Sequence, residues 1–249
     1  MTAPTLSNTR IGNFQRCRQR YVWTYLDQGM KDIPKSAGLR RGEAMHAGIE
    51  TFYRGEMAAA PLDGRITDSL QAAWDLFQPV GDDMVKDWDL MEKVLVRYFR
   101  QVAIQDQWVV RDVEITLDSP PDIPFKLTGR IDLVVQSGGT YFVDHKFNKQ
   151  VSHAHLPVDT QVSTYLLLAK MLGMEVDGVI YNVVQMAEGG IAEKEPVVRQ
   201  VATRSRQWLD AWEKQLVLLS GQIERFQDGY KPEWNSRSFT ANCHWDCSF

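Results

Sequence analysis

Two aspartates and a lysine near the middle of the chain have the types and spacing that suit metal-dependent chemistry on phosphates. Asp132 follows Gly129-Arg-Ile, and Asp144 and Lys146 form an Asp-His-Lys triplet. Aspartate oxygens are the donors that hard ions such as Mg²⁺ and Mn²⁺ prefer, and these ions act on phosphates. An amine beside such an ion can orient an attacking water or hold a phosphate oxygen.

The segment between the aspartates predicts a β-hairpin that places them on one sheet face. Apolar runs flank a Ser-Gly-Gly turn, which is a hairpin signal. With a three-residue loop, Gln136 faces Thr140. In the same register Asp132 faces Asp144, with side chains about 5 Å apart, and Lys146 projects from that face too. A two-residue loop or a bulge would shift the register by one residue.

The alternative interpretation of these residues is an Asp–Lys surface pair on an edge hairpin. That arrangement would predict polar alternation, whereas both strands are mostly apolar and look buried on both faces. Two facing carboxylates in a partly buried sheet repel, so one must be protonated or a cation must lie between them. The pattern therefore favours a metal site.

Three further side chains are candidates for the same site. Gln161 and Tyr165 are four apart on the next predicted helix and share one of its faces, where they could orient Lys146 or form a polar flank of a buried helix. His46 lies beside an apolar helical stripe. Neutral imidazole is a good ligand for Mn²⁺, although a lone histidine more often has a structural or surface role. The side chain of His145 should point away from the acids.

Composition indicates a globular protein of the cell interior. The 249 residues, 44% of them hydrophobic, suggest one large domain or one with an elaborated subdomain. A net charge of −4 gives no overall basic field that would recruit nucleic acid. The first 26 residues nevertheless hold four arginines and no acid, which fits a basic patch or an ordinary solvated helix face. No run of 18 apolar residues and no apolar signal core is present, so we expect a cytoplasmic protein without membrane spans.

Hydrophobic periodicity predicts a helical N-terminal region before a core of α/β class. We expect a central mixed β-sheet flanked by helices, with Ser7 capping the first helix. The predicted helices are 9–27, 39–53 (ended by Gly55), 66–78, 87–105, 156–172 and 204–226. The predicted strands are 109–117, 125–136, 141–147, 176–185 and 197–202.

The three cysteines lie near the two ends of the chain, at Cys17, Cys243 and Cys247. An odd count argues against a disulfide scaffold. Three thiolates could hold a metal if the termini meet. Zinc and iron–sulfur sites normally need four ligands, so buried cysteines without a metal fit the spacing equally well.

Taken together, these motifs resemble the RecB-like branch of the PD-(D/E)XK nuclease superfamily, over most of the chain. The resemblance rests on G-x-x-D at Gly129–Asp132, D-x-K at Asp144–Lys146 and Q-x-x-x-Y at Gln161–Tyr165. The segment 6–21 is similar to the family's N-terminal helix with its cysteine, and 41–46 to its helix with a metal-binding histidine.

The resemblance implies a restriction-endonuclease-like core and a Mg²⁺- or Mn²⁺-dependent deoxyribonuclease. The implied metal ligands are the side chains of His46, Asp132 and Asp144 and the backbone carbonyl of His145. Lys146 would be the catalytic lysine, with Gln161 and Tyr165 supporting either this lysine or the DNA. Glu114, on the preceding strand, would be an indirect participant.

One subgroup of this family, which includes CRISPR-adaptation nucleases and phage relatives, joins its termini with a [4Fe–4S] cluster. It uses one N-terminal and three C-terminal cysteines. Cys17, Cys243 and Cys247 match three of these four positions, and the sequence stops two residues after the last. The resemblance thus implies an iron–sulfur cluster with the fourth ligand unmatched.

The resemblance also implies an organisation and a function. Residues 1–108 would form the helical region, 109–230 the nuclease core and 231–249 a cysteine-bearing tail that packs back on the N-terminus. We expect an exonuclease that acts on single-stranded DNA or free duplex ends in a prokaryotic or phage-infected cell. The alternative is a nuclease-like DNA-binding subunit of a recombination or CRISPR-adaptation complex, with little cleavage of its own.

Overall fold

The computed structural model describes residues 5–26, 35–79, 81–148, 154–187, 190–191 and 197–229. Its helices are α1 (Asn8–Arg16), α2 (Arg18–Tyr25), α3 (Ala37–Met57), α4 (Leu62–Phe77), α5 (Asp82–Gln101), α6 (Thr160–Met171) and α7 (Arg206–Gly229), with short 3₁₀ turns η2 (Ala103–Gln105) and η3 (Leu156–Val158). Its strands are β1 (Thr5–Leu6), β2 (Val109–Asp118), β3 (Lys126–Gln136), β4 (Thr140–Asn148), β5 (Gly178–Ala187), β6 (Gly190–Ile191) and β7 (Val197–Ala202).

The strands form a mixed sheet, which confirms the predicted fold class. The central order is β2–β3–β4–β5–β7, with β1 beside the start of β3 and β6 beside the end of β5. The pair β4–β5 is parallel and is connected through α6, whereas β2–β3, β3–β4 and β5–β7 are antiparallel. A tight turn reverses the direction of the chain and so joins only antiparallel strands. The parallel pair therefore needs a longer crossover connection.

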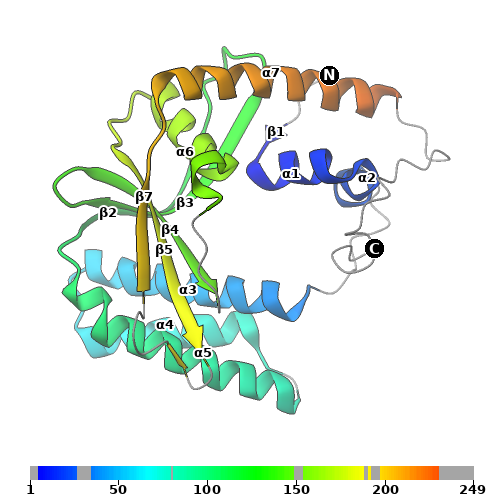
Figure 1. The fold of residues 1–249 in the computed structure, drawn as a ribbon. Helices are drawn as coiled ribbons and strands as arrows, with labels where there is room; N and C mark the ends of the chain where they lie inside the picture. The colour runs from blue at the N-terminus through cyan, green and yellow to red at the C-terminus, as the bar shows by residue number, and fades with distance from the viewer. Residues whose placement is uncertain are drawn as a thin grey trace.

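Helices cover both faces of the sheet (Figure 1). One hydrophobic cluster joins the sheet to α1, α2, α6 and α7, and a second joins it to α3, α4 and α5. Adjacent β4 residues divide between them: Phe142 packs in the first cluster and Val143 in the second. The central hairpin is therefore buried on both faces, as its apolar sequence predicts.

The predicted first helix, 9–27, is wrong at Cys17, where the chain forms two helices. Cys17 has extended backbone angles (φ −159°, ψ 116°), and its sulfur accepts the N–H of Arg20 at 3.5 Å. It therefore caps α2 in the way that Ser7, as predicted, caps α1 through the N–H of Arg10.

Two other predicted helix limits are also wrong. Helix α3 continues past Gly55 to Met57, and this glycine instead gives room to α4, since a Cβ there would lie 2.9 Å from Cγ of Arg65. The predicted helix 156–172 is interrupted at Asp159, whose side chain accepts the N–H of Val162 and so starts α6. No helix among the described residues has the length and apolar character needed to cross a membrane.

Candidate metal and catalytic centre

The register of the central hairpin is the predicted one, up to the acids themselves. Gln136 is opposite Thr140 and Leu133 is opposite Val143. The ladder between β3 and β4 ends at that second pair. One residue further, Oδ2 of Asp132 accepts the backbone N–H of His145 at 2.7 Å. The side chain of Asp132 thus takes the place of a backbone partner where the strands separate.

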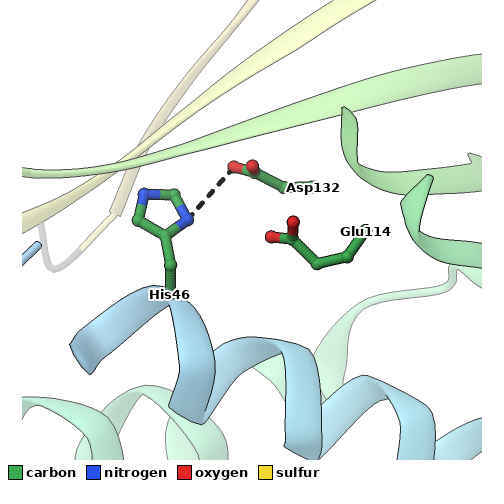
Figure 2. A group of neighbouring side chains, drawn as sticks. All are labelled: His46, Glu114 and Asp132. Carbon is green, nitrogen blue, oxygen red and sulfur yellow. Dashed lines mark ion pairs between the residues drawn. The ribbon is translucent and has the colours of Figure 1, made fainter. Parts of the chain in front are cut away.

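Three ligand-type side chains meet at this opening from three elements (Figure 2). His46 of α3, Glu114 of β2 and Asp132 of β3 offer atoms that all lie within 4.8 Å of one another. Nδ1 of His46 is 3.5 Å from Oδ2 of Asp132. The structure therefore brings together two of the three predicted ligand side chains and adds Glu114, for which the sequence indicated only an indirect role.

Glu114 reaches the centre through an unusual backbone conformation. Its φ is +53° in the middle of β2, and the pairing with β3 passes from Val113–Leu133 directly to Ile115–Ile131. A left-handed φ costs a non-glycine residue about 1–2 kcal/mol. Oε2 lies 2.8 Å from Nε of Arg130, an ion pair without hydrogen-bond geometry. No local sequence pattern marks this conformation, so the place of Glu114 beside His46 and Asp132 could not be predicted from sequence.

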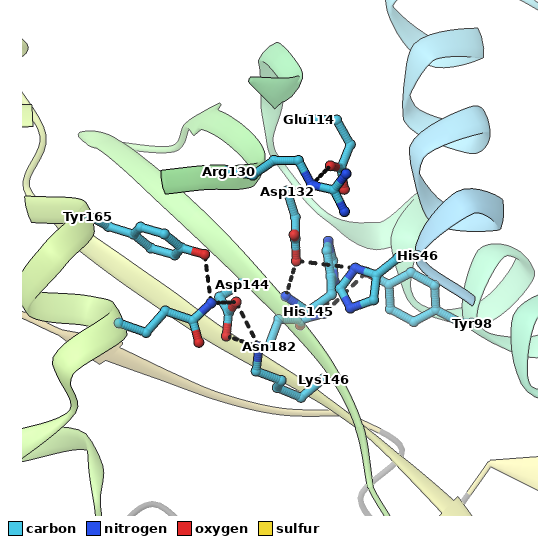
Figure 3. A network of polar contacts seen from close by, with 11 residues as sticks. His46, Tyr98, Glu114, Arg130, Asp132, Asp144, His145, Lys146, Tyr165 and Asn182 are labelled. Atoms are coloured by element: carbon cyan, nitrogen blue, oxygen red, sulfur yellow. Dashed lines mark hydrogen bonds and ion pairs between the residues drawn. The ribbon is translucent and has the colours of Figure 1, made fainter. Parts of the chain in front are cut away.

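Asp144 lies beside this group and is held by the other predicted site residues (Figure 3). Nζ of Lys146 donates to Oδ1 of Asp144 at 2.8 Å, and Nε2 of Gln161 reaches the same oxygen at 3.1 Å. Nε2 of Gln161 also lies 2.6 Å from the hydroxyl of Tyr165. The predicted residues on β4 and α6 are thus in direct contact. Asp144 is outside the 4.8 Å group, so its place as a shared ligand stays a prediction.

Gly129, the first residue of the G-x-x-D motif, lets α6 approach β3. A Cβ at this position would lie 3.0 Å from Cδ1 of Leu168 and 3.2 Å from the ring of Tyr165. The glycine therefore has a packing reason: it brings the face of α6 that carries Gln161 close to the acids on the sheet.

Burial dominates the electrostatics of the centre. It raises the pKa of Asp132 and of Asp144 to about 6, and the pKa of Glu114 to about 7. Burial, followed by the charge of Lys146, lowers the pKa of His46 to about 4. A neutral imidazole among poorly solvated carboxylates is a donor set that fits a divalent cation, since the cation would replace the lost hydration of the acids.

His145 points to the opposite face of the sheet from Asp144, as predicted. Its ring lies 6.0 Å from the ring of Tyr53 and 6.2 Å from that of Tyr98, and is fully buried. Only its backbone is directed to the centre, through the N–H bound to Asp132. Metal binding by its carbonyl stays a prediction.

The centre opens into a pocket of about 910 Å³ between the two helical layers. The floor is formed by β2, β3 and β4, and the walls by α3, α6 and the first residues of α1. Its cationic lining residues in the described part of the chain are Lys35, Arg130 and Lys146. A pocket of this size leaves room for a substrate beside the acids.

The cysteine site cannot be placed in the same way. Cys17 lies between α1 and α2, while Cys243 and Cys247 fall outside the described residues. The shared cysteine site and its cluster stay predictions.

A mixed sheet that separates at buried acids, with a lysine on the adjoining strand, is an arrangement suited to phosphodiester hydrolysis. Residues 5–249 match the PD-(D/E)XK nuclease superfamily, and the chain belongs to it. Membership makes the protein a phosphodiester hydrolase by class, in a superfamily that uses divalent metals.

The likeness to a solved structure supports the fold. A crystal structure from Eubacterium rectale, described as a "putative exonuclease", matches with a TM-score of 0.57 and 12% identity, covering 96% of this chain and 86% of that one. The structure of SSO0001 has a TM-score of 0.35 and 11% identity, covering 84% of this chain and 91% of the other. A comparison with curated proteins gave no match.

Proposed function

We propose that the protein is a Mg²⁺- or Mn²⁺-dependent deoxyribonuclease that degrades DNA from single-stranded or free ends. The observation that carries the proposal is the meeting of His46, Glu114 and Asp132 beside the Asp144–Lys146 pair, in one pocket. The metal-ligand group and the lysine can act on one phosphate only because they lie in the same pocket.

We assign the ion to the side chains of His46, Asp132 and Asp144 and the carbonyl of His145, with Glu114 as a further carboxylate at the same opening. A bound divalent ion supplies charge neutralisation at the phosphate and a lower pKa for the attacking water. Gln161 donates to the carboxylate of Asp144, and the hydroxyl of Tyr165 accepts from the same amide nitrogen. The two residues thus support the carboxylate that pairs with Lys146.

Lys146 acts on the phosphate as a cation in this proposal. Burial alone would lower its pKa, but the adjacent Asp144 raises it above the usual lysine value. The amino group therefore stays protonated and suits a role in binding a phosphate oxygen as negative charge develops there.

Two exposed leucines at the rim of the pocket favour a single-stranded substrate. Leu39 at the start of α3 and Leu76 at the end of α4 are 52% and 56% exposed and both line the pocket. A hydrogen bond of 2.7 Å from Arg40 to the carbonyl of Phe77 joins the two helix ends that carry them. Apolar side chains attract unpaired bases rather than phosphates, and bases inside a duplex are already stacked.

The likeness to the Eubacterium rectale protein supports an exonuclease, and the motifs of the sequence support the RecB-like branch. We further propose that Cys17 joins Cys243 and Cys247 in a [4Fe–4S] site, and that the protein acts in the cytoplasm of a prokaryotic or phage-infected cell. Iron and sulfide analysis of anaerobically purified protein tests the cluster. Iron-free protein would contradict it.

The function is tested by incubating 5′- and 3′-labelled single- and double-stranded DNA with Mg²⁺, Mn²⁺ or EDTA. We expect metal-dependent shortening of single strands from an end and none with EDTA, and the two labels give the polarity. An Asp132→Asn variant is the matched control. Absence of cleavage with either metal contradicts the proposal, and DNA binding without cleavage would indicate the DNA-binding subunit instead.

A further inference from the structure

A row of polar side chains crosses the sheet on the face opposite Asp144. His145, Asn182 and Arg199 are directly paired across β4, β5 and β7. Nε of Arg199 donates to Oδ1 of Asn182 at 2.6 Å, and Nδ2 of Asn182 lies 2.7 Å from Nδ1 of His145. Directly opposite residues share one face of a sheet, so the register alone forms this row.

The direction of each hydrogen bond in the row is fixed by the arginine. A guanidinium has only donors, so the atom of Asn182 that faces Arg199 must be its oxygen. Its amide nitrogen then faces His145 and donates to Nδ1. The imidazole therefore carries its hydrogen on Nε2, and among the described residues that nitrogen is buried without a hydrogen-bond partner.

The far end of the row is anchored by an ion pair. Both carboxylate oxygens of Asp106 accept from Arg199, at 2.6 and 2.8 Å. The guanidinium also lies 4.4 Å from the ring centre of Trp108. Bidentate binding and stacking restrict an arginine more than a single contact does.

Two tyrosines hold the near end of the row. The hydroxyls of Tyr53 and Tyr98 are 3.0 Å apart, and Nδ2 of Asn182 is 3.4 Å from the hydroxyl of Tyr98. Asn182 and His145 are fully buried. The imidazole of His145 thus has a fixed position, which in turn restricts the backbone of β4 at that residue.

The backbone of His145 is what holds Asp132. Its N–H donates to Oδ2 at 2.7 Å, and the same oxygen is the one that lies 3.5 Å from His46. The row from Asp106 to His145 therefore connects, through the backbone N–H of His145, to an oxygen of the candidate metal centre. None of the side chains in the row is among the described residues that line the pocket.

We propose that Asn182 and Arg199 are positioning residues for the metal centre, acting through His145 to fix the carboxylate of Asp132. The inference rests on the proposed function, since it concerns the metal of that site. Interactions behind the ligands of a metal commonly change its affinity 10–100-fold.

The test measures Mn²⁺ affinity by calorimetry on DNA-free protein. Asn182→Leu removes both contacts at similar volume, and we expect it to weaken binding about tenfold or more. Asn182→Asp keeps an acceptor for Arg199 and a polar partner for His145, and we expect affinity within a few-fold of the original. If Asn182→Leu does not fold, Arg199→Lys, at the outer end of the row, replaces it in the test, and we expect it also to weaken Mn²⁺ binding.

The matched control is Asp177→Ala, which removes the acceptor of the Thr140 N–H at the other end of β4. It should leave Mn²⁺ affinity unchanged even where it lowers the melting temperature as much as Asn182→Leu does. Nitrogen NMR of His145 should show the Nε2–H tautomer in the original protein.

Failure of the proposed function and failure of the positioning role give different results. Original protein that binds no Mn²⁺ would contradict the proposed function itself. Original protein that binds Mn²⁺, together with folded Asn182→Leu or Arg199→Lys variants of unchanged affinity, would overturn the positioning role. An equal loss of Mn²⁺ affinity in Asn182→Leu and Asn182→Asp would overturn it as well. The loss would then not depend on the polar contacts of residue 182 with Arg199 and His145.

Discussion

At the scale of single residues, Lys146 and Asp144 depend on each other. Each is largely buried, and each would be destabilised as an ion without its partner. Gln161 adds a hydrogen bond to the same carboxylate. The pair keeps a cation beside the acids of the pocket, and this charge arrangement suits a phosphate bound between lysine and metal.

We expect Lys146→Ala to abolish cleavage while leaving DNA binding largely intact. The lysine stabilises charge that develops during the reaction, whereas most affinity for DNA comes from contacts along its backbone. Cleavage of labelled single strands and fluorescence anisotropy measure the two effects. Lys35→Ala, on the pocket wall, is the control and should weaken binding more than cleavage. Turnover of Lys146→Ala at the original rate would remove the lysine from the mechanism.

The buried aspartates also predict how the stability of metal-free protein varies with pH. Their folded pKa of about 6 lies above the ordinary value of 3.8. At these two groups the folded state therefore binds protons more tightly than the unfolded state, so their contribution to stability falls as pH rises from about 4 to above 6, by roughly 1–3 kcal/mol per group. The lowered pKa of His46 contributes in the opposite sense, so the comparison with an Asp144 variant isolates the aspartates. Urea unfolding in EDTA across this range measures it. Asp144→Asn should flatten the slope, and an opposite slope there would contradict the assignment.

At the scale of elements, sequence predicts what local pattern determines. The loop of the β3–β4 hairpin and the pairing of Gln136 with Thr140 follow from turn chemistry and alternation. The helix break at Cys17 does not, because a cysteine is an unusual cap. The left-handed Glu114 and the row from His145 to Arg199 depend on pairing between distant strands, which no local pattern contains.

The contact of β3 with α6 predicts a specific effect on stability. Gly129→Val should destabilise the protein by about 1–3 kcal/mol, because its side chain would collide with Leu168 and Tyr165. Gly12→Ala, on α1 with nothing within 4 Å of the new Cβ, should instead stabilise it by about 0.5–1 kcal/mol. Urea unfolding compares both. An unchanged midpoint for Gly129→Val would contradict the packing role of the motif.

The ends of α3 and α4 predict a preference for unpaired DNA. The double variant Leu39→Ala, Leu76→Ala should raise KM for single strands several-fold, because it removes apolar contact with bases. Hydrolysis of bis(p-nitrophenyl) phosphate, which has no bases, should be unaffected. Leu218→Ala, an exposed leucine on α7, is the control. Equal effects of the double variant on both substrates would show that the leucines act on the centre itself.

At the scale of the whole molecule, the pocket lies between two helical layers that pack on opposite faces of one sheet (Figure 1). The composition and the order of elements predict the mixed sheet and the helical N-terminal region. They do not predict that α3 and α1 would line one pocket, since that depends on how both pack against the sheet. The proposed limits of the regions, 1–108, 109–230 and 231–249, stay predictions, and the last falls outside the described residues.

The proposed metal site is tested most directly by an anomalous-difference map from crystals grown with Mn²⁺. We predict a peak at the opening between β3 and β4, within about 2.0–2.3 Å of a nitrogen of His46 and an oxygen of Asp132. A carboxylate oxygen of Asp144 should belong to the same coordination sphere. A map from Mn²⁺-saturated protein with no peak at this opening, or with the ion bound elsewhere, would contradict the proposed metal site.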